Sequence, residues 1–364
     1  VKTPSVLCFD ITYLVRKSSL IRTGYQFVAR MMSSSIHKIG THNGHLHCDE
    51  VLACFLLKQL PKYQNAEIVR SRDSAVLDTC DIVVDVGGVF DATRNRFDHH
   101  QRTFNESMNS LCPSKKWVTK LSSAGLVYLH FGREIIAKFL EIKTDDPQTE
   151  IIYDKMYEHF VEEIDAIDNG ISQHDGEPRY TISTNLSHRV AFCNPTWNEN
   201  NADEQECFLK AMKLVGEEFL SRVMFYKNSW LPARELVKRA VDKREQIDSS
   251  GEIIVLAEGG CPWKDHLFAI EEEEEISPPI KYVLYTDQAG KWRVQCVPVS
   301  LKGFENRLSL SKEWCGLRDA ELSEKSGIPG CIFVHANGFI GGNETYEGAL
   351  QMARWNLRQH AESS

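Results

Sequence analysis

The sequence predicts an α/β protein of two domains, and three observations support this prediction. Short apolar runs rich in β-branched residues alternate with helical patterns, which is typical of a parallel sheet with connecting helices. The chain has 364 residues, of which 42% are hydrophobic, enough for two sizeable cores. Polar clusters follow the predicted strands, at the place where α/β proteins bind ligands. We therefore expect a parallel-sheet metal-binding domain at residues 36–200 and a smaller α/β accessory domain at 201–364, with the active site in the cleft between them.

The elements of the first domain are expected in a regular order. Its strands are predicted near residues 36–40, 66–70 and 81–86. Its helices are predicted from Cys48 to about Leu60, from Ser122 to Glu141, and from Gln148 to Asp168. Ser122 is a plausible N-cap. Residues 179–200 contain Asn-Pro and little periodicity, so we expect a connector or a substrate-facing loop there.

The second domain is expected to begin with a long charged and apolar helical region, Asp203 to Arg244. Strands are predicted near residues 252–257, 281–286 and 291–297, and a last helix from Glu344 to about Gln359. The glycine-rich stretch before that helix is predicted to form a loop. These elements together suggest a second, smaller α/β unit.

Imidazoles and carboxylates are concentrated in three short stretches, His42–Glu50, Asp85–Asp91 and Arg96–Arg102. Five of the thirteen histidines lie between positions 42 and 100. Structural zinc would recruit cysteines, but the eleven cysteines are scattered and form no CxxC motif. Mn²⁺ and Mg²⁺ favour carboxylate oxygen and tolerate imidazole. The pattern therefore predicts a catalytic site for Mn²⁺, with Mg²⁺ as the alternative.

The number of candidate ligands suffices for two cations. Such a pair, roughly 3.5–4 Å apart, stabilises both the entering and the leaving oxygen in hydrolysis of a phosphate ester. The candidate ligands are His42, His47, Asp49, Asp85 and His99, with either Asp165 or Asp168 in addition. Asp168 is favoured because Asn-Gly follows it. Asp98 and Asp91 are expected to orient imidazoles through their free ring N–H groups.

The order of these motifs carries a family resemblance. A His followed by an Asp, then Asp-Val-Gly-Gly, then Asp-His-His and a later Asp-Asn-Gly resemble the four motifs of the DHH phosphoesterase superfamily. Within it, the chain from about Ile36 to its C-terminus resembles the melanocyte-proliferating-gene family of 3′→5′ RNA exonucleases. The stretches that resemble this family are Thr41–Glu50, Asn194–Trp197, Cys261–Leu267, Trp314–Asp319 and His335–Gly342.

The resemblance implies specific roles. One metal would be held by His42, His47 and Asp85, and the other by Asp49, Asp85, His99 and Asp168, with Asp85 as the bridge. His100 would face the substrate phosphate as a hydrogen-bond donor or acid. The superfamily commonly has Asp at the position of His47, and this loop is one residue longer, so metal preference is less defined than metal binding.

Substrate contacts are expected from both domains. His335, Gly341 and Gly342 would approach a phosphate at the start of the last helix, although an ordinary glycine loop would look the same. The candidate arginines for phosphate or base contacts are Arg102, Arg179, Arg189 and Arg318, each of which is also compatible with a surface ion pair. Trp197 and Trp263 are candidates for base stacking, with core packing as the alternative.

Three functions are compatible with the motifs. The first is a two-metal 3′→5′ exonuclease acting on single-stranded RNA, which the family resemblance implies. The second is a phosphoesterase acting on pyrophosphate, cyclic dinucleotides or nanoRNA, and the third is a non-catalytic metal-binding regulator. The net charge of −9 disfavours broad coating of nucleic acid and suits an enzyme that grips only the last few nucleotides.

The first 35 residues differ from the rest. Residues 1–35 contain five basic residues and one acid, which is typical of a mitochondrial transit peptide, with an ordinary basic tail as the alternative. We expect a location in the mitochondrial matrix, with a nuclear pool if translation starts at Met31 or Met32. Irregular cysteine spacing and short apolar stretches predict a soluble intracellular protein without a membrane span. The sequence does not identify protein partners.

Overall fold

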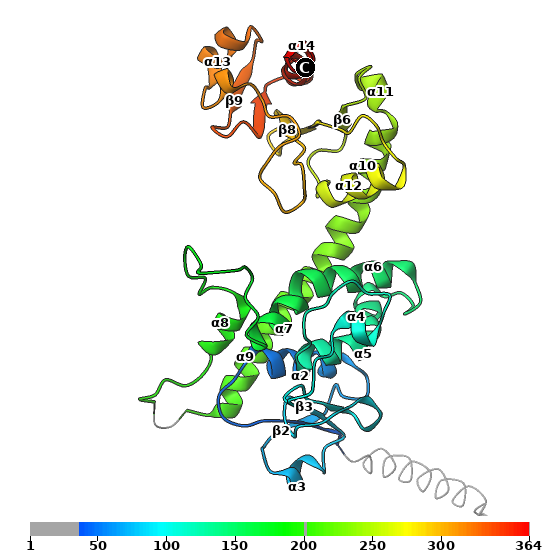
Figure 1. The fold of residues 1–364 in the computed structure, drawn as a ribbon, viewed down its shortest axis with the longest axis vertical. Helices are drawn as coiled ribbons and strands as arrows, with labels where there is room; N and C mark the ends of the chain where they lie inside the picture. The colour runs from blue at the N-terminus through cyan, green and yellow to red at the C-terminus, as the bar shows by residue number, and fades with distance from the viewer. Residues whose placement is uncertain (1–35, 200–201, 364) are drawn as a thin grey trace, which may run out of the picture. The chain divides into compact units, whose positions relative to one another are not determined.

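A computed structural model of the chain describes residues 36–199 and 202–363 (Figure 1). The predicted transit segment, residues 1–35, lies outside the described residues. The chain divides into two compact units, one ending at Leu220 and the other beginning at Ser221. The protein is a mixed α/β protein with one five-stranded sheet in each unit.

The sheet of the first unit is mostly parallel, in the strand order β2-β1-β3-β5-β4. Its strands are β1 (Lys38–Thr41), β2 (Glu67–Arg70), β3 (Ile82–Val84), β4 (Phe90–Asp91) and β5 (Arg96–Phe97). Only β4 runs antiparallel to its neighbour, β5. The carboxyl ends of β1 and β3 therefore meet at one edge, so residues that follow these strands are brought together.

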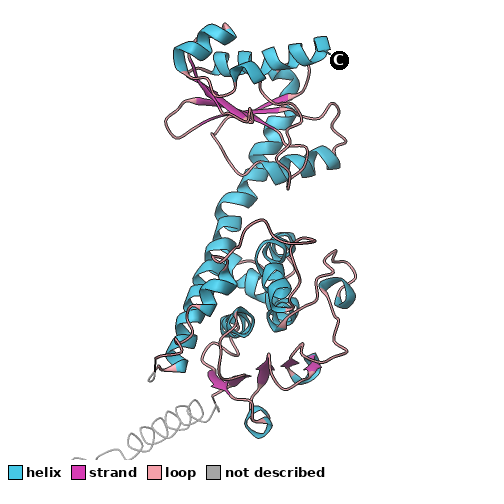
Figure 2. Cartoon of the chain, turned by 60° about the vertical axis from the view of Figure 1, so that its left-hand side comes forward, coloured by secondary structure: helices cyan, strands magenta, loops and turns pink. Residues whose placement is uncertain are grey.

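The longer helices of the first unit lie on one side of this sheet (Figure 2). The helices are α2 (Cys48–Gln59), α3 (Ser74–Leu77), α4 (Met108–Leu111), α5 (Ser123–Leu140), α6 (Pro147–Met156), α7 (Glu162–Asp168) and α8 (Leu186–Ala191). A π-helical turn, Tyr157–Val161, joins α6 to α7, so the helix predicted from Gln148 to Asp168 is one continuous helical segment. Helix α2 is almost wholly buried and packs against α5 and α7. The predicted connector contains one helix, α8, that was not foreseen.

A long helical region leads from the first unit into the second. It consists of α9 (Glu204–Phe225), a π-helical segment (Tyr226–Trp230), α10 (Leu231–Asp242) and α11 (Arg244–Ile247). The division between the units falls within α9, whereas the sequence suggested residues 200–201. Among the described residues, no helix is both long and apolar enough to cross a membrane.

The sheet of the second unit has helices on both faces. Its strands are β6 (Ile253–Leu256), β7 (Tyr282–Thr286), β8 (Trp292–Cys296), β9 (Cys331–Val334) and β10 (Ile340–Asn343), in the order β6-β7-β8-β10-β9. The helices that complete this unit are α12 (Lys264–Glu273), α13 (Asp319–Ser326) and α14 (Tyr346–Ser363). Neighbouring strand residues alternate between two cores, with Tyr282 and Leu284 on the α13/α14 side and Val283 on the α10/α12 side.

Candidate metal centre

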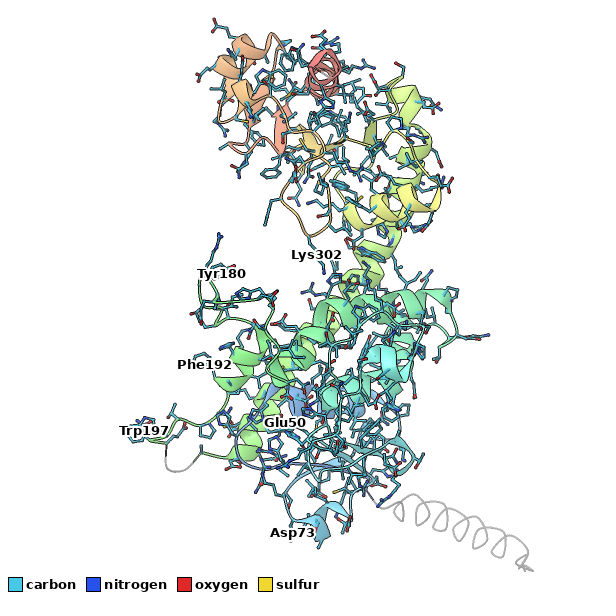
Figure 3. All side chains as sticks on the ribbon, in the orientation of Figure 1. Glu50, Asp73, Tyr180, Phe192, Trp197 and Lys302 are labelled. Carbon is cyan, nitrogen blue, oxygen red and sulfur yellow. The ribbon has the colours of Figure 1, made fainter. Side chains whose placement is uncertain are left out.

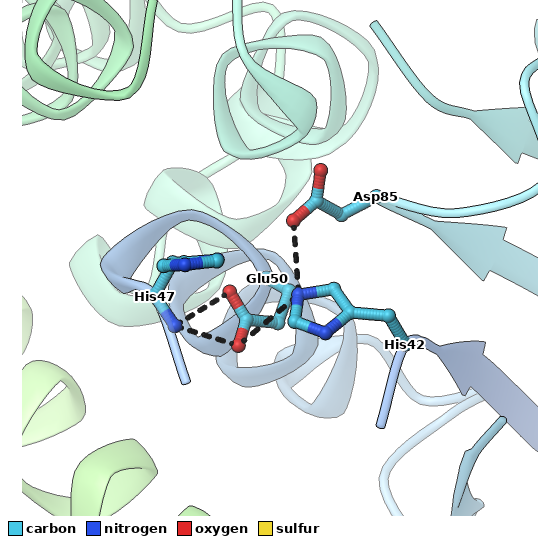
Figure 4. A group of neighbouring side chains, drawn as sticks. All are labelled: His42, His47, Glu50 and Asp85. Atoms are coloured by element: carbon cyan, nitrogen blue, oxygen red, sulfur yellow. Dashed lines mark hydrogen bonds and ion pairs between the residues drawn. The ribbon is translucent and has the colours of Figure 1, made fainter. Parts of the chain in front are cut away.

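One group of ligand-type side chains lies where β1 and β3 end and α2 begins (Figure 4). It consists of His42, His47, Glu50 and Asp85, whose ligand-type atoms all lie within 4.8 Å of one another. The Nε2 atom of His42 lies 3.4 Å from Oδ2 of Asp85 and 3.6 Å from Oε1 of Glu50. The other ring nitrogen of His42, Nδ1, is 3.2 Å from the carbonyl oxygen of Asn43, which leaves Nε2 to face the carboxylates.

Glu50 is a member of this group that the sequence analysis missed. It is completely buried in the first turn of α2, and its carboxylate accepts the backbone N–H of His47 at 2.9 Å. This bond is one half of a capping box, in which a Glu three residues after the N-cap bonds back to it. The spacing from His47 to Glu50 was the available signal, together with an acid at the start of an otherwise apolar helix.

Asp85 has an unusual backbone conformation. Its φ of 58° lies in the left-handed region, which non-glycine residues rarely adopt, and Gly87 and Gly88 follow with positive φ as well. The Asp85 N–H donates to the carbonyl of Phe97 at 3.1 Å, which holds the turn on the sheet. Strain of this kind is retained where the surroundings require a particular side-chain position. Here it directs the carboxylate toward the imidazoles of His42 and His99.

A second group lies on the other side of Asp85. Asp49, His99 and Asp168 place ligand-type atoms within 4.8 Å of one another. The Nε2 atom of His99 is 3.1 Å from Asp168, 3.4 Å from Asp85 and 3.7 Å from Asp49. Asp85 therefore contacts the imidazoles of both groups, through Oδ2 to His42 and through Oδ1 to His99.

The start of α5 holds the Asp49 carboxylate. Ser122 Oγ is 2.6 Å from Oδ1 of Asp49, and the backbone N–H groups of Ser123 and Ala124 donate to the same carboxylate. The first N–H groups of a helix lack partners within the helix and carry partial positive charge, so they stabilise an anion. Asp49 is therefore fixed by its contacts with this helix.

Asp165, the alternative ligand predicted from the sequence, is bound by Ser122 and Tyr157 and belongs to neither metal group. Its carboxylate accepts the Ser122 N–H at 2.9 Å and the Tyr157 hydroxyl at 2.9 Å, and it lies 2.7 Å from Ser122 Oγ. A Cβ atom at Gly125 would come within 2.3 Å of this carboxylate, so only glycine leaves it room. The structure thus brings Asp168, and not Asp165, to His99.

His100 is held by Asp98. The ring Nδ1 of His100 is 2.7 Å from Oδ1 of Asp98, and the His100 backbone N–H donates to the same oxygen at 3.1 Å. The other oxygen of Asp98 accepts the Gly88 N–H at 2.6 Å. The His100 side chain is 61% exposed, in contrast to that of His99 at 5%. The hydrogen bond to Asp98 raises the pKa of His100.

The imidazoles of the two groups are strongly influenced by the carboxylates. Burial alone would lower the pKa of His42, but Asp85 and Glu50 raise it to about 10. Burial alone would also lower the pKa of His99, but Asp168 and Asp85 raise it to about 11. Without a cation the site therefore retains protons on these rings. A bound metal ion has to displace them, because an imidazole ligand is neutral.

The donor set fits divalent cations. Asp49, Glu50 and Asp85 are 1%, 0% and 4% exposed, and clustered carboxylates are costly to bury without positive charge. Both ring nitrogens of His99 are buried without a well-formed hydrogen bond among the described residues. The groups consist of His, Asp and Glu only, which suits Mn²⁺ or Mg²⁺ better than a structural zinc site. These residues could therefore hold divalent cations.

Two hollows open beside the metal groups, and three residues, His47, Asp85 and His100, line both of them. The larger, of about 330 Å³, lies against α7 and α8. The smaller, of about 260 Å³, is bordered by the Gly87–Gly88 turn and by Arg72. Arg72 follows β2 in a loop without a recognisable motif, so nothing in the sequence marks it. Among the described residues, Arg72 is the arginine that lines one of these two hollows.

Asn194 has a structural role in the segment that was predicted to be a connector. Its side chain accepts the Leu46 N–H at 2.7 Å and donates to the Leu46 carbonyl at 3.0 Å. The same amide group also donates to the Ala191 carbonyl at 3.1 Å, at the end of α8. Asn194 therefore fixes both the loop that carries the first histidines and helix α8.

Several predicted residues lie elsewhere. Asp91 does not orient an imidazole: its carboxylate accepts the N–H groups of Thr93 and Arg94 and caps a short turn. Arg189 forms a bidentate ion pair with Glu218 of α9, which is the alternative to a substrate contact that the sequence allowed. The other three arginines predicted to contact substrate are exposed. They are Arg102 and Arg179 in the first unit and Arg318 in the second.

The expected glycine-rich loop is largely a β-hairpin. Gly341 and Gly342 lie within β10, paired with β8 and β9. A Cβ at Gly341 would come within 3.2 Å of the Phe333 carbonyl oxygen, and one at Gly342 would come within 3.0 Å of the Phe333 ring. Close packing thus explains both glycines, and their contact with a phosphate stays a prediction. His335 is exposed at the hairpin turn and packs on Phe339.

The chain is similar to proteins from animals and fungi. Residues 38–357 match the family MYG1_exonuc, described as "Uncharacterised protein family (UPF0160)". The MYG1 exonuclease of Mus musculus is 61% identical over 323 residues, which cover 88% of this chain and 85% of the relative. The MYG1 exonuclease of Homo sapiens is 59% identical over 327 residues, covering 89% and 86%. A MYG1 protein of Saccharomyces cerevisiae is 43% identical over 337 residues, covering 90% and 98%.

Proposed function

The chain belongs to the MYG1 family, and from this membership we propose that it is a two-metal-ion phosphodiesterase that removes nucleotides from the 3′ end of single-stranded RNA. Mammalian relatives carry the name exonuclease, which supports a nuclease. The observation that carries the proposal is the position of Asp85. Its two oxygens contact imidazoles of two separate ligand groups, as a carboxylate shared by two cations would.

Each group would hold one Mn²⁺ or Mg²⁺ ion. His42, His47, Glu50 and Asp85 would form one site. Asp49, His99 and Asp168 would form the other together with Asp85, whose Oδ1 lies 3.4 Å from His99. Bound cations would neutralise the scissile phosphate and increase the acidity of an attacking water. Asp49 and Asp85 are held by α5 and by the strained turn, so the protein fixes their oxygens before any ion arrives.

His100 has the geometry of a group that acts on the substrate. Its Nδ1 is engaged by Asp98, its side chain is exposed, and it lines both hollows. Nε2 is therefore the ring atom that remains for a substrate oxygen. A protonated imidazole here would donate a hydrogen bond or a proton to a phosphate or leaving-group oxygen.

The charge of the chain supports a terminal mode of binding. With a net charge of −9, the protein lacks the overall positive charge that a broad nucleic-acid binder uses to displace counterions. A few local contacts, such as Arg72 beside the Gly87–Gly88 turn, suffice for the last nucleotides of a strand.

The test offers purified protein with Mn²⁺ several substrates side by side. These are 5′-labelled single-stranded RNA, the same RNA with a 3′-phosphate block, single-stranded DNA, dinucleotides and pyrophosphate. The proposal predicts a ladder of 5′-labelled products that shorten one nucleotide at a time, only with free 3′ ends, and only with divalent metal. Hydrolysis of pyrophosphate or dinucleotides without a ladder on RNA would instead support a small-molecule phosphoesterase.

A further inference from the structure

The larger hollow beside the metal groups joins two kinds of surface. Its charged part includes Asp49, Asp85, Asp168 and His100. Its apolar part consists of Leu46, Ile164, Ile167 and Ala191. A volume of about 330 Å³ lies at the lower end of the range for small-molecule sites. A ligand that fits it has one compact apolar part and one anionic part, the latter bound through the divalent cations that Asp49, Asp85 and Asp168 would hold.

The apolar walls come from two elements with fixed positions. Ile164 and Ile167 belong to α7, which also supplies Asp168 to the metal group. Ala191 belongs to α8, which is joined to α9 by the Arg189–Glu218 ion pair. Asn194 joins α8 to the loop that contains Leu46. Ile167 is 40% exposed, and Ala191 is also exposed, so both present apolar surface to the open hollow. Figure 3 shows α8, and Phe192 beside it, on the outer side of the first unit.

The smaller hollow has a different character. It shares His47, Asp85 and His100 with the larger one, but its other lining includes Arg72 and the Gly87–Gly88 turn. An arginine and a glycine turn suit a phosphate. The two hollows therefore meet at the metal ligands with an apolar side and a cationic side.

We infer that the larger hollow binds the terminal nucleoside of the substrate, with base and sugar against the α7 and α8 walls and the scissile phosphate at Asp85. The penultimate nucleotide, whose 3′-oxygen is the leaving group, would extend toward Arg72. This inference rests on the proposed phosphodiesterase and adds the position of the nucleotide that is released. Apolar contact with one base would add to the contact with Arg72 and reduce the need for a broad cationic surface.

Two esters with the same reacting bond separate nucleoside binding from chemistry. One is adenosine 5′-(4-nitrophenyl phosphate), and the other is methyl 4-nitrophenyl phosphate. In both, water forms a bond to phosphorus and the bond to 4-nitrophenolate breaks, so only the non-leaving group differs. The wild-type protein with Mn²⁺ is expected to hydrolyse the nucleoside ester with a kcat/KM higher by roughly tenfold, since burial of part of a base against aliphatic side chains contributes about that much.

Filling the hollow should remove this preference. Ala191→Phe on α8 and Ile167→Trp on α7 each place a large side chain in the apolar part, and each is expected to lower the ratio of the two kcat/KM values toward one. His188→Phe is the matched control, because it adds the same ring to α8 at an exposed position that lines neither hollow. Bound Mn²⁺ is measured for every variant, and its retention shows that the metal groups are intact.

The outcomes are distinguishable. If the wild-type protein hydrolyses neither ester, the proposed phosphodiesterase fails. If it hydrolyses both with equal kcat/KM, or if both filling variants keep the wild-type ratio, the phosphodiesterase stands and the nucleoside site is wrong. A ratio that falls in both filling variants and not in His188→Phe supports the inference.

Discussion

Asp85 illustrates how the fold keeps a single buried carboxylate ionised and oriented. It combines a φ of 58° with 4% exposure and contacts to His42 and His99. Burial would raise the pKa of this carboxyl, but the two imidazoles hold it well below its usual range. The carboxylate therefore stays ionised and oriented, and conformational strain is accepted at this position to keep it so.

The two adjacent histidines are expected to differ in function. His99→Ala should lower the amount of Mn²⁺ bound to the purified protein, because His99 lies among three carboxylates of the metal groups. His100→Ala should retain metal and lose roughly 10²–10⁴-fold in kcat, the usual contribution of a general acid or hydrogen-bond donor.

Metal content by elemental analysis and turnover of labelled RNA are the two measurements. His174→Ala, in an exposed segment, serves as the control and should change neither. Equal loss of metal in both variants would show that the roles of this pair are assigned wrongly.

The sequence singled out most residues of the metal groups but not the side-chain contacts that they make. Spacing and residue type sufficed to single out His42, His47, Asp49, Asp85 and His99, because they follow predicted strands or begin a helix. Asp165 and Asp168 are one helical turn apart, and the sequence favoured Asp168 because Asn-Gly follows it; the structure places Asp168 beside His99 and Asp165 against Ser122. Glu50 was missed because its buried carboxylate resembles a helix cap in sequence.

At the scale of elements, helix α5 links the metal groups to the core of the first unit. Its first turn binds Asp49, and Ser122 connects Asp49 to Asp165 through contacts of 2.6 and 2.7 Å. Burial raises the pKa of Asp165 to about 7, although hydrogen bonds from Ser122 act in the opposite direction. The acid is thus mostly protonated in the folded protein below neutral pH.

This protonation predicts a pH dependence of stability. A carboxyl whose folded pKa is about 7 and whose unfolded pKa is about 3.9 binds its proton more tightly in the folded state. Its stabilising effect is complete below about pH 4 and is lost as the pH rises toward 7. Asp165→Asn, which carries no titratable proton, should therefore lose less Tm between pH 5 and pH 8 than the wild-type protein.

Thermal unfolding at the two pH values, with EDTA present to remove metal, gives the comparison. Asp145→Asn is the control, since Asp145 is exposed and lies outside this network. A pH dependence in Asp165→Asn equal to that of the wild-type protein would contradict the role given to the buried carboxyl.

The elements that sequence could predict are those with a strong local pattern. Strands β1 to β3 and helices α2 and α5 agree with the predicted ranges, because each has a long apolar run or a clear period. Strand β10 was predicted as a loop, since Gly341 and Gly342 disfavour a strand, and the reason for both glycines, their close packing against Phe333, is visible only in the structure. Helix α8 has six residues, too few for a recognisable period.

At the scale of the molecule, charge is divided unevenly along the sequence. Residues 1–35 hold five basic residues and one acid, while the whole chain has a net charge of −9. The described residues of both compact units thus belong to the acidic part. This division is why we propose that the N-terminal segment serves targeting and the remainder catalysis.

Targeting can be tested apart from catalysis. Residues 1–35 fused to a neutral fluorescent reporter should direct it to mitochondria, and replacing Arg16, Lys17, Arg22 and Arg30 by Glu should abolish import, because transit peptides depend on positive charge. Translation from Met32 should leave activity in vitro unchanged, since His42 is the first predicted ligand. Imaging decides the question: a wild-type fusion that stays diffuse in the cytosol would remove the mitochondrial assignment.

The central claim is that Asp85 is shared by two metal ions, and crystals grown with Mn²⁺ test it most directly. An anomalous difference map at the manganese edge should show two peaks roughly 3.5–4 Å apart. One should lie among His42, His47 and Glu50 and the other among Asp49, His99 and Asp168, with one Asp85 oxygen toward each. A single peak, or two peaks that do not share Asp85, would contradict the account.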